Sequence, residues 1–187
     1  MRRLLHAVSE SRVNYRASFA IEMACPAALA WIGSSAATGW LAPVACAGAG
    51  LLAFSFIEYA IHRWLFHAPD GVMSAIHRTH HDAPHGHTAL PCITSAVVSA
   101  VCWLALTPLV GTMAASFFLS GVLGGYSYYS ILHHLEHRTR INTVPFRWLQ
   151  RRWAEHSVHH RLAHTNFGVT TSLWDHVFAT HYLARKR

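Results

Sequence analysis

Four long apolar stretches, separated by shorter polar segments, dominate the hydrophobic pattern of the chain. They cover residues 19–37, 41–61, 93–110 and 112–132. Each is close in length to the ~20 residues that a helix needs to cross the hydrocarbon core of a bilayer. The links TGWLAP and TPLVGT are short and contain Gly and Pro, so each pair is expected to form a tight helical hairpin. The pattern predicts an all-α integral membrane protein with four transmembrane helices in two hairpins, although the small residues of the last two stretches leave a shallow re-entrant path open.

The basic residues predict how these helices are oriented. All 15 Lys and Arg residues lie before the first stretch, between the second and third, or after the fourth. The positive-inside rule therefore places the arm 1–18, the segment between the hairpins and the tail 133–187 in the cytoplasm. Lys186 is the single lysine. This preference for arginine favours a bacterial source, and hence the bacterial inner membrane.

Composition narrows the class of protein further. Only 12% of the residues are charged, about half the usual fraction of a soluble domain. The basic residues flank the apolar stretches, so membrane headgroups are the expected partner and nucleic acid is not. Four cysteines without CxxC spacing are expected to be buried free thiols: Cys25, Cys46, Cys92 and Cys102.

The organisation expected is a single domain over residues 1–187. The N-terminus lacks the uninterrupted apolar core of a secretory signal. After the arm 1–18, residues 19–132 carry the four spans and the first two histidine groups. Residues 133–187 mix Trp, Phe and Arg, which indicates amphipathic helices that form a cytoplasmic cap with the other two groups.

Eleven of the 17 histidines lie in four short motifs. These are EYAIHRWLFH (58–67), HRTHH (77–81), HHLEH (133–137) and EHSVHH (155–160). Residues three or four apart share a helix face, so HxxHH presents three imidazoles to one side and HxxxH presents two. His62 and His67 are five apart, which fits a helix that ends near residues 64–66. The expected topology brings all four motifs to one membrane face, and their ten imidazoles suffice for two metal ions. Imidazole binds iron, zinc, copper and nickel, so the ligands alone do not choose the metal.

These motifs, together with NFGVTTSLWDHVFAT at 166–180, resemble the membrane fatty acid hydroxylase, sterol desaturase and carotenoid hydroxylase superfamily. EYAIHRWLFH, HRTHHDAP and the closing motif are most similar to its fatty acid 2-hydroxylase branch. The resemblance covers about residues 58–180. It implies two iron ions, for which zinc can substitute, with dioxygen as co-substrate and hydroxylation of a C–H bond in a fatty acyl or related lipid. The metal ligands that it implies are His62, His67, His77, His80, His81, His133, His137, His156, His159 and His160.

The resemblance also implies roles for other residues. Tyr126 and Tyr129 are expected to line the substrate site, with an interfacial position at the end of a span as the alternative, and Asn166 and Trp174 to pack beneath the metals. Apart from the resemblance, ligating histidines usually donate their second ring N–H to a carboxylate, so Glu58 and Asp175 are expected to support the ligands. The sequence shows no N-terminal cytochrome b5 domain, so electrons are expected from a separate ferredoxin or cytochrome b5-like protein with its reductase.

Some histidines fit the pattern less well. His134 is ambiguous, because HxxxH favours His133 with His137 and His134 points about 100° away on a helix. His85 and His87 follow a proline and lie outside the motifs, so both are expected to be bystanders. The loop HGHTALPC lacks the basic residue and second proline expected from the family, and Ala179 stands where glycine is usual.

Three other functions compete with lipid hydroxylation. A carotenoid hydroxylase or a sterol or lipid desaturase belongs to the same superfamily, and oxygenation and desaturation differ only in how the C–H bond is placed. A metal transport or storage protein needs histidines or acids within the spans, which are nearly free of them. A bis-histidine haem protein needs facing single histidines there, which are absent.

Overall fold

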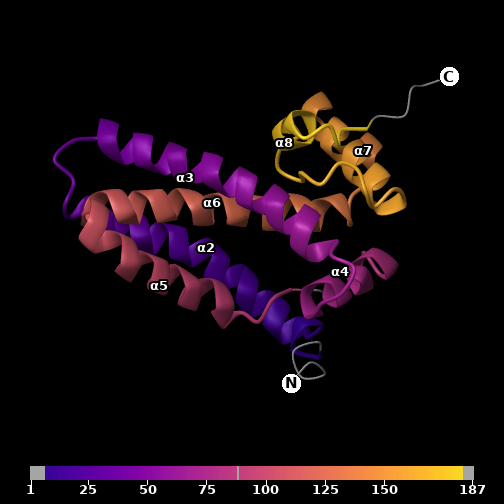
Figure 1. Cartoon of the computed structure of the whole chain (residues 1–187), viewed down its shortest axis with the longest axis horizontal. Helices are drawn as coiled ribbons and strands as arrows, with labels where there is room; N and C mark the ends of the chain where they lie inside the picture. Colours follow the sequence, from indigo (N-terminus) through magenta and orange to yellow (C-terminus); the bar gives the residue numbers. More distant parts are fainter. Residues whose placement is uncertain (1–6, 88, 183–187) are drawn as a thin grey trace. The chain divides into compact units, whose positions relative to one another are not determined.

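The computed structural model describes residues 7–87 and 89–182, and these residues form helices and no strands (Figure 1). The α-helices are α2 (Arg12–Ser34), α3 (Leu41–Ala60), α4 (Val72–Asp82), α5 (Ile93–Val110), α6 (Thr112–Glu136), α7 (Arg147–Arg161) and α8 (Leu173–Val177). A π-helix, η1 (Ile61–Phe66), and a 3₁₀ turn, η2 (Ile141–Thr143), complete the set. The all-α prediction is confirmed for the described residues.

The chain divides into two compact units. The first, here called the bundle unit, comprises Met1–Phe54 and His87–Tyr128. The second, the histidine unit, comprises Ser55–Gly86 and Tyr129–Arg187. Helices α3 and α6 begin in the bundle unit and end in the histidine unit. Each unit is described by itself below.

Within residues 7–87 and 89–182, three helical segments are long and apolar enough to cross a membrane: Arg12–Ser34, Leu41–Phe66 and Ile93–Val110. The third has the expected bounds. The first begins seven residues earlier than expected, because Ser11 caps it by accepting a hydrogen bond from the backbone N–H of Asn14. The fourth expected span corresponds to α6, whose Gly, Ser and Tyr residues lower its hydropathy. It is not among the three, so its crossing stays a prediction.

Helices α3 and α6 approach each other closely within the bundle unit. A Cβ atom added to Gly50 would lie 2.0 Å from the carbonyl oxygen of Phe118, and one added to Gly121 would lie 2.1 Å from that of Ala47. Only glycine permits such backbone contact, which is how helices associate where lipid removes the hydrophobic drive between them. Helix α6 therefore packs on small residues.

Proline 26 interrupts the hydrogen bonding of α2, and α6 compensates for it. Proline has no N–H, so the carbonyl of Glu22 loses its partner one turn earlier. The hydroxyl of Ser127 donates to that carbonyl at 2.5 Å, and Ser120 donates to the carbonyl of Pro26 at 2.8 Å. Side chains of a neighbouring helix thus satisfy a backbone group that lipid could not.

Helix α5 lies beside α2 and buries none of its own residues (Figure 1). Its exposed surface is aliphatic, with Val97, Val101 and Leu104 each at least half exposed. The four cysteines are free thiols, but each is half-buried where we expected full burial. They lie on or beside helices whose apolar surface faces outward, which explains the difference.

The core of the histidine unit joins the end of α6, the segment after η2, helix α7 and the loop after α7. Leu132, Val144, Trp153 and Val169 form this core. The indole N–H of Trp153 donates to the hydroxyl of Thr139 at 3.0 Å, so even the largest core side chain has its polar atom satisfied. The chain that follows α7 folds back over it before α8.

Candidate metal centre

Five histidines from three segments converge to form a first group, here called cluster A. One ring nitrogen of each lies within 4.8 Å of those of the others, and the members are His62, His67, His77, His81 and His159. They come from η1 and its C-terminal cap, from α4 and from α7. No carboxylate or thiol belongs to the cluster, so it offers nitrogen ligands alone.

A π-helix brings the first two members of cluster A together. The helical segment ends at Phe66, as the spacing predicted, but its last six residues, from Ile61, form a π-helix rather than an α-helix. The backbone N–H of His67 donates to the carbonyl of His62 at 3.2 Å, five residues back. This wider turn aligns residues five apart, which an α-helix would not do. The sequence did not predict it.

The nitrogen contacts within cluster A fit a metal site better than a hydrogen-bonded group. Atom Nε2 of His77 lies 3.1 Å from Nε2 of His62, 3.2 Å from that of His67 and 3.0 Å from that of His81. A neutral imidazole nitrogen forms only one hydrogen bond, as donor or as acceptor. Three such contacts cannot all be hydrogen bonds, whereas lone pairs that converge on one point are what a cation requires.

The remaining five predicted ligands form cluster B. Its members, whose ring nitrogens again lie within 4.8 Å of one another, are His80, His133, His137, His156 and His160. They come from α4, from the end of α6 and the residue after it, and from α7. Atom Nε2 of His156 lies 2.9 Å from that of His137 and 3.1 Å from that of His160. All ten predicted ligands therefore lie in one or other cluster.

The two HxxHH motifs are each divided between the clusters, which the sequence did not predict. In α4, His77 and His81 belong to cluster A and His80 to cluster B. In α7 the assignment is reversed, because His156 and His160 belong to cluster B. On a helix, the residue four positions after a given residue points about 40° to one side of it, whereas the residue three positions after it points about 60° to the other side. Each helix thus contributes ligands to both clusters.

Burial keeps these imidazoles neutral. Together with the neighbouring imidazoles, it lowers the pKa of His80 to about 2 and that of His159 to about 3. The pKa values of His67 and His137, which are less buried, fall to about 4 for the same reason. At neutral pH each ring therefore presents an unprotonated nitrogen, which is the form that binds metals.

Backbone carbonyls orient two histidines of cluster A. Because a carbonyl only accepts, Nδ1 of His62 donates to Phe167 at 2.5 Å and Nδ1 of His159 donates to Thr165 at 2.7 Å. Each bond places the proton on Nδ1 and leaves Nε2 free to face the cluster. The loop after α7 thus fixes the tautomer of both rings.

Two buried carboxylates, both singled out from the sequence, hold that loop. Glu58 accepts hydrogen bonds from the backbone N–H of Val169 at 2.5 Å and from the backbone and hydroxyl of Thr170. Asp175 accepts from the backbone N–H groups of Phe167 at 2.8 Å and Gly168 at 2.9 Å. Glu58 and Asp175 therefore support the carbonyls that orient the imidazoles, rather than contacting the imidazoles themselves.

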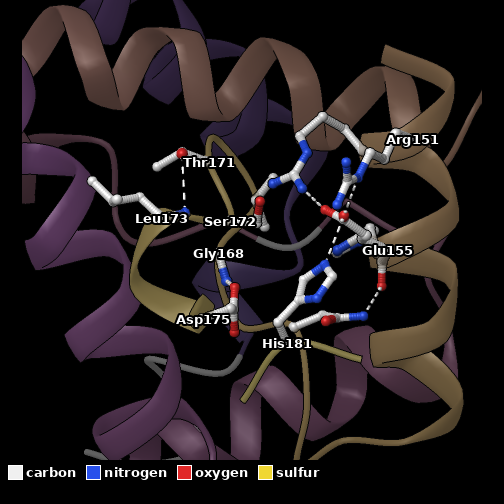
Figure 2. A network of polar contacts seen from close by, with 12 residues as sticks. Arg151, Glu155, Gly168, Thr171, Ser172, Leu173, Asp175 and His181 are labelled. Carbon is white, nitrogen blue, oxygen red and sulfur yellow. Dashed lines mark hydrogen bonds and ion pairs between the residues drawn. The ribbon is translucent and has the colours of Figure 1, made fainter. Parts of the chain in front are cut away.

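A third buried carboxylate, Glu155, organises the outer side of α7 (Figure 2). It pairs with Arg151 at 2.9 Å and with Arg152, and it lies 3.0 Å from Nε2 of His181. The side chain of Asn166 donates to its backbone carbonyl at 3.2 Å. The sequence analysis did not predict this network, for which the four-residue spacing between Arg151 and Glu155 was the available signal.

The predicted substrate residues lie in different units. Tyr129 stacks on His133 in the histidine unit, with ring centroids 5.3 Å apart. Tyr126 packs against Phe54 in the bundle unit, at 6.1 Å. Among the described residues the two clusters include neither the expected bystanders His85 and His87 nor the ambiguous His134.

Helical segments able to cross a membrane, together with two clusters of neutral imidazoles, define a membrane protein with a candidate dinuclear metal centre. Residues 47–180 match the fatty acid hydroxylase family, and the chain belongs to it. It is 32% identical over 139 residues to a dihydroceramide fatty acyl 2-hydroxylase of Arabidopsis thaliana, FAH2, covering 70% of this chain and 58% of that protein. Identity to the fatty acid 2-hydroxylase of Rattus norvegicus is 30%, covering 70% of this chain and 38% of that protein.

The fold is shared with a solved structure. Full-length Scs7p, of which only the hydroxylase domain is visible, superposes with a TM-score of 0.75 at 22% identity, over 96% of this chain and 70% of that one. The chain thus spans between about a third and two thirds of the length of the relatives it matches. The predicted similarity to the fatty acid 2-hydroxylase branch is confirmed.

Proposed function

We propose that this chain is a membrane oxygenase that hydroxylates a C–H bond of a fatty acyl lipid, with two iron ions held by the ten clustered histidines. The observation that carries the proposal is the pair of five-imidazole clusters, in which one neutral nitrogen of His77 meets three others although it can form only one hydrogen bond. The two clusters offer donor sets for two cations and contain no thiolate that would favour a structural zinc site.

The chemistry requires a partner protein. Bound iron would supply the activation of dioxygen and the oxidation of the C–H bond. Hydroxylation consumes one dioxygen, two electrons and two protons for each alcohol and water formed. A separate ferredoxin or cytochrome b5-like protein with its reductase is proposed to supply the electrons. The chain's own residues hold the ligands: Glu58 and Asp175 secure the loop whose carbonyls fix His62 and His159.

The lipid is proposed to enter from the bilayer. Helix α6 is proposed as the fourth span, because the short TPLVGT link leaves it no other way to continue from α5 than a hairpin. With the basic segments inside, both termini and the metal centre face the cytoplasm, in a bacterial inner membrane and within a single domain. Tyr126 and Tyr129 are proposed to line the approach of the acyl chain.

The relatives favour an acyl substrate over the competing ones. Those reported above are named as fatty acid or fatty acyl hydroxylases, which supports hydroxylation of an acyl lipid rather than a carotenoid, a sterol or desaturation. The proposal for this chain is therefore oxygen insertion into an acyl chain.

Expression in bacterial membranes with iron tests the proposal. Mass spectrometry of the lipids is expected to show hydroxylated acyl chains, and the purified protein is expected to contain two metal ions. His80→Ala and His159→Ala, one from each cluster, should reduce product to background. His164→Ala, an exposed histidine outside both clusters, should leave product unchanged. A wild-type chain that holds fewer than two metals, or makes no hydroxylated lipid with a reductant supplied, would contradict the proposal.

A further inference from the structure

A buried acid that the metal clusters do not include lies at the end of α6. The Glu136 side chain is 1% exposed, and both of its carboxylate oxygens are buried without a hydrogen-bond partner. Burial raises the pKa of Glu136 well above its usual value, whereas the nearby guanidinium of Arg152 favours the charged form of the acid. Arg152 itself pairs with Glu155. Buried polar atoms almost always have a hydrogen-bond partner, so an acid in this position calls for an explanation.

The nearest ring nitrogen to Glu136 belongs to a member of cluster B. Nδ1 of His156 lies 3.7 Å from Oε2 of Glu136, and this nitrogen is also buried without a hydrogen-bond partner. The separation exceeds a normal hydrogen bond by about 0.8 Å. The ring's other nitrogen, Nε2, faces the cluster, 2.9 Å from Nε2 of His137. His156 is thus placed between a carboxylate on one side and a metal position on the other.

The two clusters differ in what stands behind their histidines. In cluster A, His62 and His159 donate to neutral backbone carbonyls. In the part of the chain that the structure describes, the approach of Nδ1 of His156 to Glu136 is the one close contact between a clustered histidine and a carboxyl group. An imidazole that donates its N–H to a carboxylate is more basic, and so binds a cation more strongly, than one that donates to a carbonyl. The carboxylate also offsets part of the cation's charge.

We propose that Glu136 accepts the Nδ1–H of His156 and thereby makes cluster B hold a divalent ion more tightly than cluster A. Glu136 is a positioning residue, because it acts through His156 and does not face the cluster. The two metal positions are then inequivalent: they fill in order, cluster B first, and empty in the reverse order. This inference rests on the proposed role of the histidines as metal ligands.

Stepwise loading of the chelator-treated full chain in detergent with Co²⁺ tests the inference, because the absorption of bound Co²⁺ reports each step. The wild type is expected to bind two ions in two resolved steps. Glu136→Gln, which keeps the shape and removes the charge, should weaken the tighter step about 10- to 100-fold and leave the other unchanged. Asp70→Asn, the same change at an exposed acid, should alter neither step.

Glu136→Gln binding with wild-type affinity at both steps, or weakening both equally, would overturn the inference. A readout on the wild type guards against a variant that does not fold. With histidine labelled by ¹⁵N and zinc bound, Nδ1 of His156 should carry a strongly downfield proton, and its absence would also overturn the inference. Two bound ions without hydroxylated lipid would refute the proposed function and leave the inference standing. Fewer than two ions in the wild type would refute both.

Discussion

The bundle unit and the histidine unit differ in the groups that bring their segments together. In the bundle unit, small residues such as Gly50 and Gly121 are buried and long aliphatic side chains face outward. In the histidine unit, charged residues such as Glu155 and Asp175 are almost fully buried, and Trp148 is more than half exposed. The first unit is held by backbone contact and the second by charge-assisted hydrogen bonds. The two should therefore respond differently to pH, to lost acceptors and to added methyl groups.

Acid should have the largest effect, and it should act on the histidine unit when metal is absent. In the unfolded chain each histidine titrates near pH 6.5, whereas the buried His80 and His159 have pKa values of about 2 and 3. Below pH 6.5 the unfolded state thus binds protons that the folded state does not, so stability is full above about pH 7 and falls as the pH decreases. Between pH 6.5 and pH 5, each of these two imidazoles should lower the free energy of unfolding by about 2 kcal/mol.

Hydrogen-exchange protection factors, measured region by region on the chelator-treated protein at pH 7, 6 and 5, check this prediction. Protection should fall in the histidine unit and persist in α2 and α5. A parallel loss in both units would break the comparison.

Loss of a single buried acceptor should have the next largest effect. Asp175→Ala leaves the backbone N–H groups of Phe167 and Gly168, and the hydroxyl of Thr180, without their acceptor. The free energy of unfolding should fall by at least about 3 kcal/mol, because hydrogen bonds to a charged group contribute about 1.5–3 kcal/mol each. Asp82→Ala, at an exposed acid, should change it by less than about 0.5 kcal/mol. Equal unfolding temperatures for the two variants would contradict this account.

An added methyl group should act most strongly in the bundle unit. Gly121→Ala places a Cβ 2.1 Å from the carbonyl oxygen of Ala47, and the helices must separate at a cost of about 1–3 kcal/mol. Gly124→Ala, three residues along the same helix, meets no atom within 4 Å and should stabilise the helix by about 0.5–1 kcal/mol. Thermal unfolding in detergent should rank Gly121→Ala below the wild type and Gly124→Ala above it. The reverse order would show that backbone contact does not hold the bundle unit.

The smallest effect should be a gain in stability in the histidine unit. Ala179 has a φ of 54°, a left-handed conformation that costs alanine about 1 kcal/mol. Ala179→Gly should therefore stabilise the protein by about 0.5–1 kcal/mol. Ala83→Gly, at an exposed alanine with a φ of −135°, should destabilise it by a similar amount. Unfolding midpoints that move in the same direction for both would contradict the role of φ.

The left-handed conformation of Ala179 explains a feature that the family resemblance had marked in the sequence. The resemblance marked this position as one where glycine is usual, and the structure supplies the reason. The sequence also singled out Glu58 and Asp175 as acids that support the histidines, and they prove to hold the loop that orients His62. It did not single out Thr170, because its partner Glu58 lies on a segment far away in sequence.

The sequence was sufficient to predict most of the helical segments and the ten histidines that come together. Hydropathy and histidine spacing are local properties, and a helix converts them directly into spans and faces. The division of the histidines between clusters A and B, and the carbonyls that orient them, became visible in the tertiary structure alone. The same is true of the π-helix that aligns His62 with His67. These features depend on how several separate segments meet, and a one-residue difference in helical turn redirects a side chain by about 100°.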